Sequence, residues 1–291
     1  MEALGDVHKL SLAARPKAAV ITCIGISHLE RLKTRDNILK AKLEIVDGMD
    51  ENGVLVVNGD DEYLSKAIIT HPANVYRYGI ENTLADVVAK DIEAVGFTTT
   101  FTICDKLYGE IRCTIPTVGN HNVMNALCAY TVVSRMGFDA HTVAANLAGY
   151  TVSGQRQKLV HKSDILFIED CYNAAPGSMK AAVDTMKIVA TGRTIAVFGD
   201  MMELGEDEFA LHRGVGEYAK EKGVDCMWTW GERAAHICAG FGDDAINFET
   251  KDQLGDYIIE NIRPGDTIVF KASHSRRFED IIEKVYNGLE K

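Results

Sequence analysis

Three short segments of this sequence place polar residues directly after an apolar run. They are residues 169–173, 199–205 and 271–274, and they include Asp170, Asp200 and Lys271. In an open parallel sheet, ligands bind beyond the carboxyl ends of the strands. A helix that follows such a strand offers unpaired N–H groups to an anion. One loop of this kind is as often an ordinary turn as a site, but three on one sheet edge favour a ligand site.

Lys42 stands on what is otherwise an apolar helix face. Helical periodicity predicts a helix over residues 34–49, with Thr34 as its N-cap. The apolar face of this helix consists of Ile38, Leu39, Leu43, Ile45, Val46 and Met49, with Lys42 in its middle. Because burying a bare charge is costly, the ammonium must be paired, neutral or chemically modified. A snorkelling lysine or a structural ion pair would satisfy the same pattern.

Asn122 and Asn125 are three residues apart at the start of a helix predicted over residues 121–136, so they share a face. Their carboxamides suit the recognition of a nucleobase edge. N-capping by Asn120 or Asn122 would explain one of these asparagines but not both. His28 follows a predicted strand, and a lone histidine there is more often structural than a metal ligand.

The elements that must position these residues change character near residues 151–154. The first part predicts strands and helices in mixed order: strands at 18–25 and 53–58, shorter strands over 75–115, and helices at 121–136 and 140–147. The second part alternates strand and helix signals regularly, which favours a doubly wound, mostly parallel sheet. A length of 291 residues suits two domains. We therefore predict an α/β protein with domains at 1–151 and 152–291.

The composition indicates which classes of partner and which cell compartment suit this chain. A net charge of −11 without a basic stripe makes the chain a poor binder of nucleic acid, and small metabolites brought in with Mg²⁺ fit better. No apolar run approaches the roughly 20 residues that span a bilayer. Seven cysteines without a C-x-x-C pair predict reduced thiols and a cytoplasmic location.

These motifs together resemble the Mur ligase family, and within it the members that add D-alanyl-D-alanine. The resemblance runs from about Met1 to Asn287 in the family's order and spacing, through residues 18–30, 39–45, 119–125, 154–156, 169–176 and 198–212. The segment Phe198–Gly205 with His212 is similar to the signature of this type. It argues against other enzymes of the superfamily, such as a folylpolyglutamate or cyanophycin synthetase. The fold implied is an ATPase-like central domain followed by a Rossmann-like C-terminal domain.

The resemblance implies an ATP-dependent ligase that joins D-alanyl-D-alanine to UDP-N-acetylmuramoyl-tripeptide through an acyl phosphate, with Mg²⁺ neutralising the phosphate charge. The implied catalytic residues are Lys42, His28 and Arg156. The implied metal residues are Glu2, His28 and a carbamylated Lys42. The implied nucleotide-binding residues are Asn122, Asn125, Arg156 and Asp170. The implied substrate-binding residues, which face the dipeptide or the nucleotide edge, are Tyr172, Asn173, Lys271 and Ser273.

The sequence also departs from the family pattern. It contains no G-x-x-G-K-[ST] loop to cradle ATP phosphates, and no counterpart of the family's N-terminal domain for the UDP-sugar. Cys23 stands where the family usually has Asn, Ala175 replaces an Asn, and His274 replaces an Arg. We therefore expect a truncated ligase that binds nucleotide weakly and does not ligate by itself. A non-catalytic relative, which serves as a nucleotide-binding or interaction protein, is the alternative.

Overall fold

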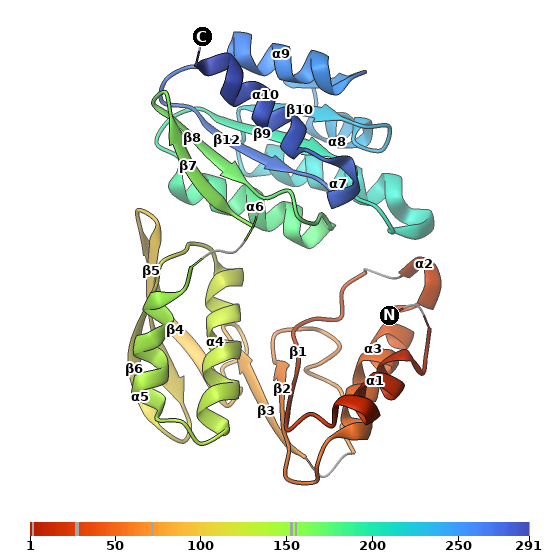
Figure 1. The fold of residues 1–291 in the computed structure, drawn as a ribbon, viewed down its shortest axis with the longest axis vertical. Coiled ribbons are helices and arrows are strands. Elements are labelled where there is room, and N and C mark those ends of the chain that lie inside the picture. Colours follow the sequence, from red (N-terminus) through yellow and green to blue (C-terminus); the bar gives the residue numbers. More distant parts are fainter. Residues whose placement is uncertain (2, 27–28, 71–72, 152–153, 155, 291) are drawn as a thin grey trace. The chain divides into compact units, whose positions relative to one another are not determined.

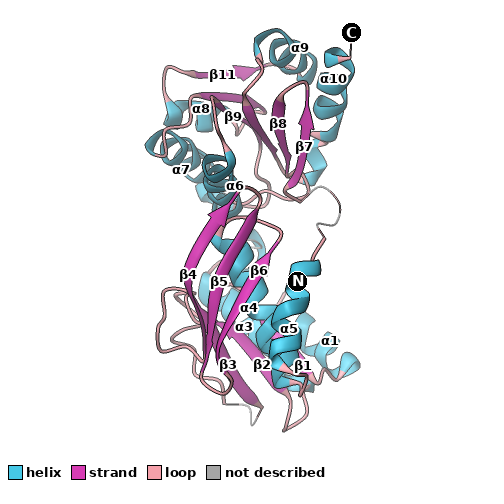
Figure 2. Cartoon of the chain, turned by 90° about the vertical axis from the view of Figure 1, so that its left-hand side faces the viewer, coloured by secondary structure: helices cyan, strands magenta, loops and turns pink. Residues whose placement is uncertain are grey.

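The computed structural model describes residues 1, 3–26, 29–70, 73–151, 154 and 156–290. The chain divides into two compact units, unit 1 (Met1–Thr151) and unit 2 (Val152–Lys291). Each unit has its own six-stranded sheet, and helices pack against it (Figures 1 and 2). No helix in the described part of the chain is long and apolar enough to cross a membrane.

Unit 1 combines a parallel half-sheet with an antiparallel meander. Its strands are β1 (Ala18–Ile21), β2 (Val54–Asn58), β3 (Asn74–Gly79), β4 (Val87–Val95), β5 (Thr98–Asp105) and β6 (Gly109–Ile115). They lie in that order, parallel from β1 to β4 and antiparallel from β4 to β6. Its helices and 3-10 turns are α1 (Asp6–Ala14), α2 (Leu29–Leu32), α3 (Arg35–Leu43), η1 (Glu44–Gly48), α4 (Asn120–Arg135), α5 (Ala140–Asn146) and η2 (Leu147–Gly149).

The unit 1 sheet is buried on both faces at β2. Along β2, Leu55 and Val57 point into a core with Ile38 of α3, whereas Val54 and Val56 point into a core formed with α4 and α5. This alternation follows from the two-residue period of a strand. Parallel strands covered on both faces read as continuous apolar runs, which is why β2 was predictable from its sequence.

Unit 2 is the doubly wound sheet that the alternating pattern predicts. Its strands are β7 (Lys158–Lys162), β8 (Ile165–Glu169), β9 (Thr194–Gly199), β10 (Cys226–Trp230), β11 (Ala245–Phe248) and β12 (Thr267–Lys271). Its helices and 3-10 turns are α6 (Pro176–Val189), η3 (Gly205–Asp207), α7 (Glu208–Glu221), α8 (Ala235–Phe241), α9 (Lys251–Asn261), η4 (His274–Arg276) and α10 (Glu279–Leu289). The strand order is β11-β10-β9-β12-β8-β7, and only β7 runs antiparallel to its neighbour. The α/β prediction is thereby confirmed.

The structure differs from the sequence prediction in several local elements. The strand predicted over residues 18–25 ends at Ile21. The helix predicted over 34–49 ends as an α-helix at Leu43 and continues as η1, although Thr34 caps it as predicted by accepting from the Asn37 N–H. Strand β7 was not predicted, because it is a polar edge strand without a buried residue. Helix α1 was not predicted either, because it leaves Leu10 and Leu12 exposed and buries only Ser11.

Candidate functional site

In unit 2, the three polar segments lie on three neighbouring strands. β12 sits between β8 and β9 and is parallel to both, so the three carboxyl ends meet at one edge of the sheet. The loops after β8 and β9 lead to α6 and α7, whereas the loop after β12 leads to α10, which packs on the opposite face with α9. Such a change of direction between adjacent strands is where open α/β sheets bind ligands.

Lys271 joins two of these strand ends. Its ammonium donates to Asp170 Oδ2 at 2.6 Å and to the carbonyl oxygen of Asn173 at 2.9 Å. Both charged side chains are buried, with 3% of the Lys271 side chain and 12% of the Asp170 side chain exposed. A buried ion pair of this kind fixes the two loops relative to each other, because separating it would leave a bare charge out of water.

The loop after β9 is held by the loop after β12. Ser273 accepts from the Met202 N–H through its hydroxyl at 3.0 Å, and its own N–H donates to the Asp200 carbonyl oxygen. The buried Asp200 carboxylate accepts from the Ala234 N–H and lies 2.7 Å from Nη2 of Arg276. Ser273, expected to face a substrate, therefore also holds the neighbouring loop.

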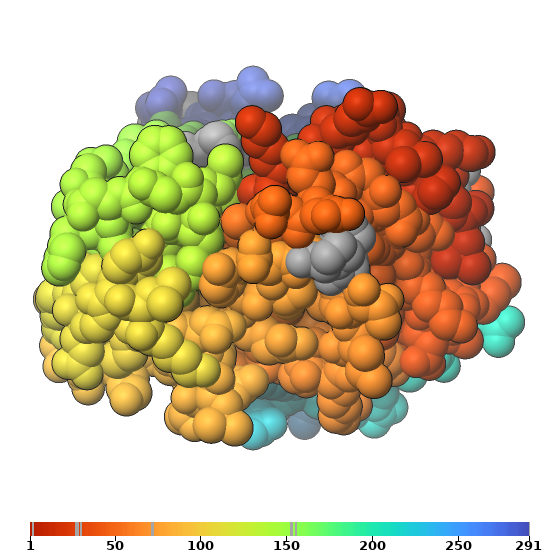
Figure 3. Space-filling model, turned by 90° about the horizontal axis from the view of Figure 1, so that it is seen from below, coloured from red at the N-terminus to blue at the C-terminus, as the bar shows by residue number. Residues whose placement is uncertain are grey.

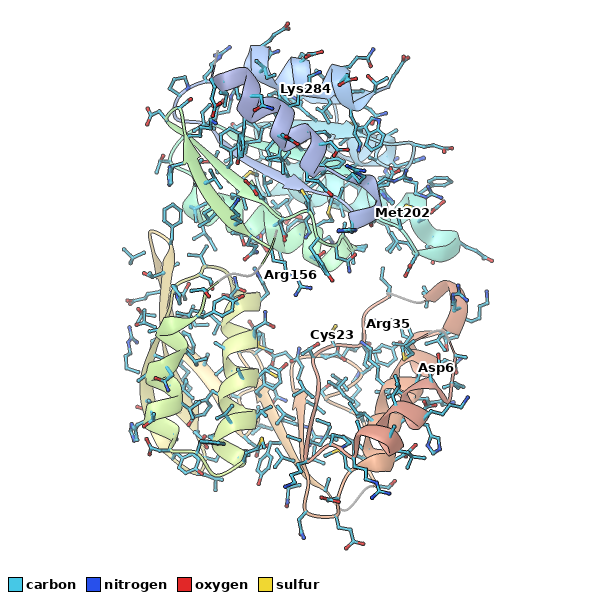
Figure 4. All side chains as sticks on the ribbon, viewed as in Figure 1. Asp6, Cys23, Arg35, Arg156, Met202 and Lys284 are labelled. Carbon is cyan, nitrogen blue, oxygen red and sulfur yellow. The ribbon has the colours of Figure 1, made fainter. Side chains whose placement is uncertain are left out.

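An exposed aromatic cluster lies at the same end of unit 2. The Arg156 guanidinium stacks over the Tyr172 ring at 4.1 Å from its centroid, and the His274 ring lies 5.8 Å from that of Tyr172. Arg156, Tyr172 and Asn173 are all exposed, and so are open to a ligand. Figure 4 labels Arg156 together with Met202 of the loop after β9, and both lie on the same side of unit 2.

In unit 1, Lys42 lies at the carboxyl end of β1. Its ammonium donates to the carbonyl oxygen of Cys23 at 2.7 Å, and its side chain is half-buried. The same strand end is held by Asp61, which accepts from the Ile24 N–H, and by Arg35, which donates twice to the Ile24 carbonyl oxygen. Figure 4 shows Cys23 and Arg35 close together at this edge of unit 1. The charge of Lys42 thus meets a carbonyl dipole, which is one way to satisfy a half-buried ammonium.

The two asparagines lie in the first turns of α4, but neither caps it. Gly119 occupies the N-cap with a positive φ of 99°, so N-capping by Asn120 or Asn122 was a wrong alternative. Asn122 instead donates from its carboxamide to the Val118 carbonyl oxygen at 2.8 Å and is half-buried. Asn125 is exposed, so its carboxamide faces solvent and is open to a ligand.

The metal site inferred from the resemblance is only partly within the structure. Glu2 and His28 lie outside the described residues. Among the residues that are described, no group of three or more His, Cys, Asp and Glu side chains gathers to hold a metal ion. Lys42 nevertheless fits a carbamate, because a carbamylated lysine keeps one N–H and can still donate it to the Cys23 carbonyl oxygen.

Sequence reasoning gave several residues that shape these edges no role of their own. Glu169 is buried and accepts from the Tyr286 hydroxyl at 2.7 Å and from Lys158. Arg35 and Arg276 also had no individual assignment. The sequence indicates His212 only as part of a signature. It lies among the buried positions Val215, Gly216 and Ala219 of α7, so it is, like Lys42, a polar residue on an apolar helix face.

Comparisons with known proteins match both units of the chain. The model of the Mur ligase middle domain matches residues 1–133, and that of the Mur ligase glutamate ligase domain matches residues 155–274. The UDP-N-acetylmuramoyl-tripeptide--D-alanyl-D-alanine ligase of Bacillus subtilis (strain 168) is 37% identical over 290 residues, which are 97% of this chain and 62% of that relative.

Two solved structures extend the comparison. Crystal structure I of MurF from Acinetobacter baumannii has a TM-score of 0.90 and 26% identity, over 100% of this chain and 63% of that one. The MurF ligase of Thermotoga maritima in complex with ADP has a TM-score of 0.87 and 25% identity, over 99% of this chain and 66% of that one. The chain thus spans 62–66% of the length of these three relatives. It belongs to the Mur ligase family and carries that family's middle and C-terminal domains.

Proposed function

We propose that this chain carries the nucleotide and amine-substrate edges of a ligase that joins D-alanyl-D-alanine to UDP-N-acetylmuramoyl-tripeptide in peptidoglycan precursor synthesis. The supporting observation is the 37% identity, over 97% of the chain, to a relative of that name. The convergence of three polar loops at a switch point of the unit 2 sheet gives the proposal a physical basis. Seven free cysteines suit a reducing compartment, so we place the chain in the cytoplasm.

In unit 2, we assign the exposed groups to ligand contact and the buried pair to their support. Arg156 would meet nucleotide phosphates, because an exposed guanidinium presents several donors to phosphate oxygens. Tyr172 and Asn173 would face the dipeptide, and so would Ser273, although it is buried. Asp170 and Lys271, already paired with each other, would hold the loop that meets the ribose and the substrate.

In unit 1, we assign Asn122 and Asn125 to the adenine edge of the nucleotide. Lys42, with Glu2 and His28, would hold Mg²⁺ after carbamylation. When bound, Mg²⁺ neutralises the charge of the transferring phosphate. The hydrogen bond from Lys42 to the Cys23 carbonyl oxygen would orient the modified side chain.

Titration calorimetry of the full chain with Mg-ADP tests the nucleotide assignment. We expect weak binding that Asn125→Ala weakens further, with no change in unfolding temperature because Asn125 is exposed. Asn74→Ala, at an exposed position of β3, is the matched control. No heat at millimolar Mg-ADP would remove the nucleotide assignment.

The ligase assignment has its own test. We expect the purified 291 residues to show no ATP-dependent ligation, because they contain no phosphate-cradling loop. Measurable ligation would overturn that expectation. Binding of Mg-ADP without any binding of D-alanyl-D-alanine would favour the non-catalytic nucleotide-binding relative instead.

A further inference from the structure

The loop after β9, here called the β9 loop (residues 200–204), is held by three other parts of unit 2. Asp200 Oδ1 accepts from the Ala234 N–H at 2.8 Å, beyond the end of β10. The Met201 N–H donates to His212 Nε2 at 2.9 Å, on α7. The Met202 N–H donates to the Ser273 hydroxyl at 3.0 Å, beyond the end of β12. Three successive residues are thus fixed from three directions.

The next residue of the loop has a strained backbone. Glu203 has a φ of 64°, in the left-handed region, while its side chain is exposed and the following Leu204 is buried. A non-glycine residue in this region is strained and persists only when its surroundings enforce it. The hydrogen bonds to residues 200–202 and the burial of Leu204 enforce it from both sides.

We propose that His212 is a positioning residue, which holds the β9 loop at the sheet edge beside Ser273 so that the loop can meet the incoming dipeptide. The identity of the dipeptide rests on the proposed function, whereas the positioning itself does not. His212 is completely buried and touches no solvent, so its effect on a ligand is transmitted through the loop.

The hydrogen bonds fix one form of the His212 ring. A backbone N–H is always a donor, so Nε2 must accept from Met201 and carry no proton. Nδ1 therefore carries the proton and donates it to the Glu208 carbonyl oxygen at 2.6 Å. Adding a second proton would point an N–H at the Met201 N–H and break this bond.

The surroundings of His212 favour this neutral form. Burial lowers the pKa of its imidazole, against the opposing effects of the Glu208 carbonyl and the Asp200 and Glu208 carboxylates. Arg233 lowers the pKa further, and its guanidinium is paired with Glu208 at 2.5 Å. The bond to Met201 is therefore intact at neutral pH, and it is lost only as the pH falls through the lowered value.

Selective ¹⁵N-methionine labelling of the full chain makes the loop directly observable. The chain has nine methionines, and the Met201 and Met202 amide signals are identified by their absence in Met201→Leu and Met202→Leu. His212→Leu removes the acceptor at similar volume, whereas the side-chain carbonyl of His212→Gln restores one. We expect about tenfold faster exchange of the Met201 amide in His212→Leu and near-wild-type exchange in His212→Gln.

His236→Leu is the matched control. His236 is a half-buried histidine of α8 that stacks on Phe209, with ring centroids 4.4 Å apart. We expect no change in Met201 exchange from this substitution. Equal exchange in wild type, His212→Leu and His236→Leu would overturn the proposal.

A pH titration gives a second reading that needs no destabilised variant. In wild type we expect the Met201 signal to move in one step as the pH falls below the ordinary histidine range, and we expect His212→Gln to lack that step. A wild-type Met201 signal that does not respond to pH would overturn the proposal, even if His212→Leu fails to fold.

Titration with D-alanyl-D-alanine then connects the loop to the ligand. We expect His212→Leu to weaken the dipeptide Kd about tenfold and His212→Gln to leave it near wild type, with the unfolding midpoint of His212→Gln unchanged. If wild type binds no dipeptide, the proposed function fails while the exchange measurement still decides the role of His212. If the dipeptide binds equally to wild type and His212→Leu, the positioning role is overturned.

Discussion

Lys271 and Asp170 form a buried ion pair, 2.6 Å from Nζ to Oδ2, between residues 101 positions apart in the sequence. The pair ties the end of β12 to the end of β8 at the edge where three polar loops meet. Lys271 also donates to the Asn173 carbonyl oxygen, so it holds the backbone of the segment that carries Tyr172 and Asn173. A residue expected to face a ligand therefore also supports the loop that surrounds it.

Removing the ammonium of Lys271 should destabilise unit 2 strongly. Lys271→Met leaves the Asp170 carboxylate buried without its cation, and we expect a loss of about 3–5 kcal/mol in the free energy of unfolding. Urea unfolding followed by tryptophan fluorescence measures this, because both tryptophans, Trp228 and Trp230, lie in unit 2. Lys220→Met is the control: its pair with Asp244 is exposed, and we expect less than about 1 kcal/mol. Equal losses in the two variants would contradict this account.

Two glycines of α7 should respond in opposite directions to the same substitution. A Cβ on Gly216 would overlap the carbonyl oxygen of Ile237 on α8, so Gly216→Ala forces the two helices apart. We expect it to cost about 2 kcal/mol. A Cβ on Gly214 meets nothing within 4 Å, and Gly214→Ala should stabilise unit 2 by about 0.5–1 kcal/mol, because alanine loses less backbone entropy in a helix. The same fluorescence-detected urea transition measures both, and a shift in the same direction would refute the packing argument.

Asp105 should make the stability of unit 1 depend on acid pH. Burial alone would raise the pKa of its carboxyl, but hydrogen bonds from Arg135, the Leu107 N–H and Tyr130 together lower it. Arg135 holds the carboxylate with two nitrogens, at 2.7 and 2.9 Å. In Figure 3 the yellow segment around the β5–β6 turn lies beside the lime segment that follows α4.

The lowered pKa of Asp105 determines how the stability of unit 1 changes with pH. A carboxyl whose pKa is lower in the folded state stabilises it above the unfolded value of about 3.9, and this stability is lost as the pH falls through the folded value. Hydrogen exchange of peptides from β5 and α4 should therefore show wild type more protected than Asp105→Asn at neutral pH. The difference should shrink below about pH 4. A difference that stays constant with pH would show that Asp105 contributes no titrating stability.

The sequence predicted the central strands of the unit 2 sheet well, because β8, β9, β10 and β12 are largely buried and read as apolar runs between helices. It also brought Asp170, Ser273 and Lys271 to one edge, since the carboxyl ends of parallel strands meet there. It did not indicate the Lys271–Asp170 pair, which depends on the strand order. It did not indicate the His212–Met201 bond either, which depends on how the β9 loop packs against α7. Lys42 is a second example. Its position on the helix indicates that the ammonium must be satisfied, but only the structure identifies the Cys23 carbonyl oxygen as its partner.

The stacking of Arg156 on Tyr172 should affect phosphate binding if Arg156 meets the nucleotide. An exposed cation–π contact contributes about 0.5–1 kcal/mol, so losing it should weaken Mg-ADP binding about two- to fivefold. Tyr172→Leu removes the ring beneath the guanidinium, which lies 4.1 Å from its centroid, whereas Tyr172→Phe keeps it. We therefore expect calorimetry to give weaker binding for Tyr172→Leu and wild-type binding for Tyr172→Phe. Weaker binding in both variants would assign the effect to the Tyr172 hydroxyl. Unchanged binding in both would show that the Arg156–Tyr172 contact does not contribute to Mg-ADP binding.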